Sequence, residues 1–195
     1  MTVKNTVRGK LAPSEVTLDR SELKRRLGED AETTLVAYEK LKGALFSECD
    51  IKYSLTDVEL STDGEECTVG GVNIRSRSLA RMLCGYKRGY LIALTLGISV
   101  DRFIKRTSVG SITEGVVADA IASTLADSAC FEIIKRHLDG ISHTPPFAPG
   151  YGDSDTECIG GLLKIADQSG YLGITTTSSS LMLPTKSIIV IVGKM

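Results

Sequence analysis

The sequence predicts an α+β domain in which long central helices pack with antiparallel strands. Residues 112–138 repeat apolar side chains at helical spacing, whereas residues 51–74 partly alternate and are interrupted by turn signals. A continuous apolar run at 187–193 is typical of a buried strand. Because the turns within 51–74 are short, these strands should pair antiparallel, and the chain lacks the regular βαβ alternation of a parallel sheet.

Length and composition are those of an ordinary globular protein. The 195 residues suit one domain spanning 1–195, with residues 1–17, which contain Pro13, predicted as a loose N-terminal arm or an edge segment. A net charge of −1 gives no basic surface for nucleic acid or an anionic membrane. No apolar run approaches a membrane span, and the first residues show no signal-peptide core, so we expect a cytoplasmic protein.

The cysteine and histidine content argues against a metal site. The chain has two histidines, His137 and His143, and its five cysteines show no Cys-x-x-Cys spacing. A structural zinc site needs four such ligands, usually in closely spaced pairs. We therefore expect reduced thiols and no bound metal.

The first half of the chain should contain two helices followed by a β-meander. Asp19 and Glu22 are spaced as a capping box, Gly28 can end that helix, and a second helix should run from near Asp30 to about Phe46. Asp63-Gly64 is a hairpin signal. The remaining elements are predicted as strands at 51–60, 67–69, 72–74 and 90–96 and short helices at 78–84 and near 100–104.

The helix at 112–138 should be the longest element and should be largely buried. Ser111 and Glu114 form a capping box, and apolar residues then recur at intervals of four. His137 lies in the last turn, where positive charge complements the helix dipole, so it has a structural explanation. Asp127 is a carboxylate within this apolar helix, and it either needs a partner or lies on an exposed seam.

Residues 143–153, here called the proline segment, contain three prolines and therefore cannot form a helix. Gly150 and Gly152 flank Tyr151, so the main chain can bend sharply or approach a ligand closely. Such a segment can be a rigid connector with a packing tyrosine, or it can present a binding edge. Ser154 and Glu157 form another capping box, which predicts a helix N-terminus just past Tyr151 that could receive an anionic group.

The chain ends with a polar run at 175–180, Met182, Pro184 and the apolar strand. Because that strand is continuously apolar, it should be buried on both faces, with residues 188–192 in the interior of the sheet.

These motifs resemble the activation domain of cobalamin-dependent methionine synthase and its standalone relatives. The resemblance is carried by 149–153 (Pro-Gly-Tyr-Gly-Asp), then Ile174-Thr175, Met182, Pro184 and Lys186-Ser187, and upstream by 19–28, 95–97 and 119–121. It covers nearly the whole chain. It implies a curved α+β fold that binds S-adenosylmethionine and caps a cobalamin module while an inactivated cofactor is reductively methylated.

The resemblance also implies which residues bind the ligand. Gly150 and Tyr151 come from the Pro-Gly-Tyr turn, Ala148 would offer backbone groups, and Asp127 falls where many relatives carry a glutamate. The family pattern has an arginine five residues before the tyrosine, but this chain has Pro146. Proline cannot clamp a ligand carboxylate through paired hydrogen bonds, so we expect weak binding.

Two functions follow from the resemblance. The first is a standalone S-adenosylmethionine-binding reactivation subunit for a cobalamin-dependent methionine synthase or related corrinoid methyltransferase, with cobalamin supplied by the partner. The alternative is a docking module for a corrinoid protein that does not bind S-adenosylmethionine. In either, residues 146–153 and 177–183 should face the partner. The chain has no Asp-x-His-x-x-Gly cobalamin motif, and Cys158 and His143 lack a triad context, so we assign no catalytic residue.

Overall fold

The computed structural model describes residues 5–28 and 31–195, with side chains from residue 36 onward in the second range. In these residues a curled sheet is formed entirely by antiparallel pairs. Its strands are β1 (Thr6–Leu11), β2 (Ile51–Asp63), β3 (Glu66–Val69), β4 (Val72–Arg75), β5 (Arg88–Thr95) and β8 (Ser187–Lys194). They are ordered β4-β3-β2-β5-β8, with β1 on the first half of β2.

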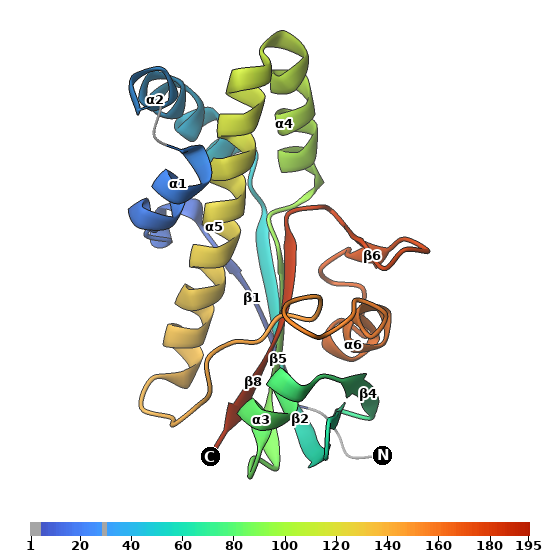
Figure 1. Cartoon of the computed structure of the whole chain (residues 1–195). Helices are drawn as coiled ribbons and strands as arrows, with labels where there is room; N and C mark the ends of the chain where they lie inside the picture. The colour runs from blue at the N-terminus through green and yellow to red at the C-terminus, as the bar shows by residue number, and fades with distance from the viewer. Residues whose placement is uncertain (1–4, 29–30) are drawn as a thin grey trace.

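Helices cover both faces of this sheet (Figure 1). On one face are α1 (Arg20–Leu27), α2 (Ala31–Ser47), α4 (Ile98–Gly110) and α5 (Ile112–Leu138). On the other are α3 (Arg77–Leu83) and α6 (Ile159–Ala166). A separate hairpin joins β6 (Thr175–Thr176) to β7 (Met182–Leu183), and η1 (Pro13–Glu15) follows β1. The α+β class is confirmed.

The two cores share the central strands because side chains alternate across a strand. Ile92 and Val190 contribute to the core beneath α5, whereas Leu91, Ile189 and Ile191 contribute to the core beneath α3 and α6. Each of these five side chains is at most 4% exposed. The prediction that the last strand is buried on both faces is therefore confirmed.

The position of β8 within the sheet corrects the sequence prediction. β8 is the last strand of the sheet rather than an interior one. Its outer edge is partly covered by the proline segment, through bridges from His143 to Lys194 and from Phe147 to Ile191. A continuous apolar run indicates that both faces of a strand are buried, but it does not indicate whether each edge of the strand pairs with another strand.

The prediction of a loose arm at residues 1–17 is also corrected. Residues 6–11 form β1, and Leu11 is buried while Thr6 and Thr56 side chains hydrogen-bond across the pair at 3.1 Å. The alternative of an edge segment was the right one. Residues 1–4 lie outside the described residues.

The helices match their capping signals in most places. Asp19 caps α1 by accepting from Ser21 and Glu22 amides, and α1 ends before Gly28, as predicted. Glu22 does not complete the predicted capping box, because its carboxylate pairs with Arg25 and Arg26. α5 spans the predicted 112–138 and has a largely buried surface, whereas α4 is longer than the short helix predicted near 100–104.

Candidate functional site

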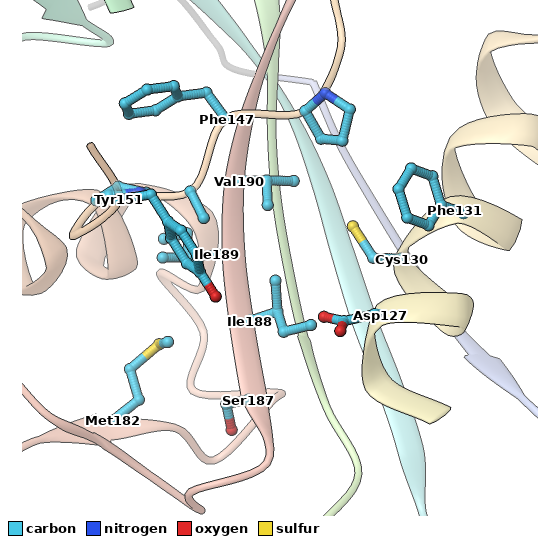
Figure 2. A pocket seen from close by; sticks show the side chains of 13 residues that line it. Asp127, Cys130, Phe131, Phe147, Tyr151, Met182, Ser187, Ile188, Ile189 and Val190 are labelled. Atoms are coloured by element: carbon cyan, nitrogen blue, oxygen red, sulfur yellow. The ribbon is translucent and has the colours of Figure 1, made fainter. Parts of the chain in front are cut away.

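A groove of about 420 Å³ lies between α5 and the proline segment, along β8 (Figure 2). It is lined by Asp127, Cys130 and Phe131 from α5, by 146–149 and Tyr151 from the proline segment, by Met182 from β7 and by 187–190 from β8. This volume is within the range of sites that bind small molecules.

The proline segment pairs with β8 only where its residues carry amide hydrogens. The Phe147 amide donates to the Ile191 carbonyl at 2.9 Å, the Ile191 amide returns to the Phe147 carbonyl at 2.8 Å, and the Thr144 amide donates to Gly193 at 2.9 Å. Pro145 and Pro146 between them have no amide hydrogen to donate. The pairing resumes at Phe147 and stops there, because Pro149, the next residue of the same parity, has no amide hydrogen, and the chain then leaves the sheet edge.

A tight turn then carries Tyr151 over the groove. The Tyr151 amide donates to the Ala148 carbonyl at 3.3 Å, and Gly150 has φ of 91°. A Cβ on Gly150 would lie 2.8 Å from the Thr156 side chain, so both conformation and space favour glycine there. In Figure 2 Tyr151 lies on one side of β8 and Phe131 on the other. Their side chains are 72% and 60% exposed.

Asp127 points from α5 toward β8 in Figure 2 and is ion-paired with Arg26 of α1. The Arg26 Nη2 and Asp127 Oδ2 atoms are 2.7 Å apart, and 42% of the Asp127 side chain is exposed. Loss of hydration raises the pKa of Asp127, and the charge of Arg26 opposes that rise. The sequence left a charged partner and an exposed position as alternatives for Asp127, and the structure shows both. The exposed part of the carboxylate remains accessible to a ligand cation.

Asp153 fixes the far end of the proline segment to α3. Its carboxylate accepts from the Ser76 hydroxyl and from the Arg77 amide, both at 2.7 Å, at the start of that helix. The Ser76 hydrogen bond and the Arg77 and Ser78 donors lower the Asp153 pKa to about 2. Because Tyr151 is two residues away, this contact holds the Tyr151 turn in place.

Neutralising Asp153 should release the Tyr151 turn. The native pKa lies below the ordinary value near 3.8, so the contact is fully present above about pH 4 and is lost as the pH falls toward 2. Asp153→Asn should bring faster proteolytic cleavage at 147–153 already at neutral pH. Asp155→Asn, which removes a nearby carboxylate outside this contact, should not. Equal cleavage of both variants would contradict the assignment.

The helix after the proline segment begins later than predicted. α6 begins at Ile159, with no side-chain cap at Cys158, whereas the capping pattern placed its start at Ser154. Asp155 accepts from the Glu157 amide at 3.0 Å and Ser154 donates to the Asp155 carbonyl, so these side chains stabilise a turn instead. The predicted anion site at a helix N-terminus beside Tyr151 is therefore wrong.

The structure brings together most of the predicted ligand-binding residues. Asp127, Ala148 and Tyr151 line one groove, and Gly150 shapes its turn without lining it. The sequence did not indicate Cys130 or Phe131, although both follow Asp127 at helical spacing and therefore share its face of α5.

No lysine or arginine is among the residues that line the groove within the described part of the chain. Arg136, in the last turn of α5, pairs with Glu15 and Glu132. Lys186 is bonded to Asp119 and Ser123 at 2.7 and 2.9 Å. For Arg136, Lys186 or Arg26 to bind a ligand carboxylate, that cation would first have to leave its present partner.

The other chemistry-bearing side chains have structural roles. His137 Nε2 lies 2.9 Å from the Tyr53 hydroxyl, and burial lowers the pKa of His137. Cys158 is buried, and loss of hydration raises the pKa of its thiol to about 11, which makes it a poor nucleophile. The described residues contain no group of three His, Cys, Asp or Glu side chains that could hold a metal ion. Among them no helix is long and apolar enough to cross a membrane.

Comparison with known proteins shows the fold. No family model matches this sequence, and no curated protein matches it. Among solved structures the chain is similar to a crystal structure of the MetH reactivation domain bound to AdoHcy, with a TM-score of 0.69 and 10% sequence identity. The similarity covers 97% of this chain and 78% of that chain. The curved α+β fold implied by the sequence resemblance is thus confirmed, with a structural neighbour from a reactivation domain.

Proposed function

We propose that this chain binds S-adenosylmethionine in the groove beside β8 and serves as a separate reactivation subunit for a cobalamin-dependent methionine synthase or related corrinoid methyltransferase. The observation that carries the proposal is the convergence of Asp127, Ala148 and Tyr151 on one groove in a fold similar to a reactivation domain bound to AdoHcy. In this role the chain contributes a ligand site and a docking surface, and the partner contributes the cobalamin.

The groove suits the parts of such a ligand. The Tyr151 ring is exposed and can lie against a sulfonium cation or a planar base. The Asp127 carboxylate can accept hydrogen bonds from the ligand ammonium. The apolar side chains of Ile188 and Val190 line the wall of the groove, where they can exclude water from the ligand.

Exposed apolar side chains lie beside the groove and could form the surface that contacts the partner protein. Tyr151, Leu181 and Leu183 are 72%, 62% and 42% exposed, and the hairpin that carries the two leucines also provides Met182 to the groove. Residues 177–180 add hydroxyl and backbone groups without charge. A surface of this kind suits a transient interface with a corrinoid protein.

Among the described residues that line the groove there is no lysine or arginine, and this favours a second candidate function. Without a guanidinium at position 146, the same surface could dock on a corrinoid protein and bind no S-adenosylmethionine. A binding assay on an immobilised corrinoid protein tests the docking surface that both functions share. It compares the retention of Tyr151→Ala and Met182→Ala with that of the unaltered chain.

Calorimetric titration with S-adenosylmethionine separates the two functions. We expect saturable binding, weakened about two- to thirtyfold by Tyr151→Ala, because a cation on an aromatic face contributes roughly 0.5–2 kcal/mol. Val109→Ala is the matched control, since Val109 is exposed at the end of α4, outside the groove. Absence of binding by the unaltered chain would support the docking module.

A further inference from the structure

The charged groups at the groove are distributed unevenly. Asp127 is the one charged side chain among the described residues that line it. The neighbouring Arg26 guanidinium pairs with Asp127 through Nη2 at 2.7 Å and with Glu22 through Nε at 2.8 Å. Two carboxylates therefore share this one cation, and the exposed part of the Asp127 side chain is left to attract a ligand of positive charge.

Aromatic side chains strengthen this preference for positive charge. Tyr151 and Phe131 line the groove, and both are exposed, on opposite sides of β8 (Figure 2). The face of an aromatic ring attracts a cation, and ligands with a quaternary ammonium group are recognised in this way. A sulfonium group carries the same charge on a similarly substituted centre. The described lining thus combines a carboxylate with aromatic faces, which is a set of groups that suits a cation.

A ligand carboxylate, in contrast, would have no free cation to bind. Lys186 is bonded to Asp119 and Ser123 at 2.7 and 2.9 Å, and Arg26 is held by its two carboxylate partners. A charged group that loses hydration without gaining a partner has an unfavourable free energy. A ligand carboxylate would also share the groove with Asp127, and like charges repel. The groove therefore disfavours an amino-acid carboxylate.

We propose that the preferred ligand of this groove is a sulfonium nucleoside that carries an ammonium group and no carboxylate, the class to which decarboxylated S-adenosylmethionine belongs. The Asp127 carboxylate accepts hydrogen bonds from the ammonium, and the Tyr151 ring lies against the sulfonium. S-adenosylmethionine is then the weaker ligand of the two. This inference rests on the proposed function and specifies the chemical class of its ligand, an amine in place of an amino acid.

Calorimetric titration of the full chain with the two compounds tests the preference. They differ only in the carboxylate, so the contacts of the base, the ribose and the sulfonium cancel in the comparison. We expect decarboxylated S-adenosylmethionine to bind about tenfold more tightly, because it has no unpaired carboxylate to desolvate.

Each outcome of this titration distinguishes the inference from the proposed function. Equal affinities, or tighter binding of S-adenosylmethionine, would overturn the inference and leave the proposed function standing. Binding of the decarboxylated compound alone would support the inference and reject S-adenosylmethionine as the ligand. Binding of neither compound would reject both.

Substitution of Asp127 tests whether its charge produces the preference. Asp127→Asn should bring the two affinities to within about threefold, because the ammonium loses its carboxylate partner and Arg26 is released to bind a ligand carboxylate. Asp139→Asn, at the exposed end of α5 and outside the groove lining, is the matched control and should keep the full preference. Because each result is a ratio of two affinities on one sample, partial unfolding of a variant cannot imitate it. A preference that survives Asp127→Asn would overturn the inference.

Discussion

Replacing Leu125 with alanine should lower the free energy of unfolding by about 2–5 kcal/mol, because the truncated side chain leaves a cavity that the surrounding core cannot fill. Leu125 is fully buried in the middle of α5, within the core between that helix and the sheet. Urea unfolding of the variant and the unaltered chain measures the change directly.

Val116→Ala is the control for this measurement. Val116 lies on the same helix but is 55% exposed, so its truncation should change the free energy of unfolding by less than about 0.5 kcal/mol. Alanine has a higher helix propensity than leucine or valine, so propensity by itself should make neither substitution destabilising. If Leu125→Ala were no more destabilising than Val116→Ala, α5 would not be the central buried element of this fold.

α5 could be predicted from the sequence because its signals are local. Ser111 provides the cap, and apolar residues repeat along the same stretch that the structure shows as helix. The position of β8 could not be predicted this way. Whether a strand lies at an edge depends on distant partners, here Phe147 and the ladder to β5, and neither changes the apolar pattern of β8 itself.

The candidate site could be predicted only in part, because its shape also depends on contacts between segments that are distant in the sequence. The resemblance identified Asp127, Ala148 and Tyr151, and the fold places them around one groove. The start of α6 was wrong because Asp155 stabilises a turn that competes with the cap predicted at Ser154.

Replacing Pro146 with arginine should tighten S-adenosylmethionine binding by about ten- to over a hundredfold. Pro146 lines the groove, and the described lining residues include no lysine or arginine that could bind a ligand carboxylate. A hydrogen bond to a charged group contributes roughly 1.5–3 kcal/mol, and a guanidinium can form two in parallel. Calorimetry on both forms measures the gain.

Two further substitutions separate the guanidinium from the loss of the proline ring. Pro146→Ala removes the ring without adding charge, and it should bind no more tightly than the natural chain. Pro146→Lys adds a charge without the planar pair of donors, so its gain should be smaller than that of arginine. Equal affinities for Pro146→Arg and Pro146→Ala would show that the ligand carboxylate is bound elsewhere. Arg26 is paired with the groove residue Asp127, and Lys186, which precedes the groove residue Ser187, is paired with Asp119, so binding at either cation would require one of those ion pairs to open.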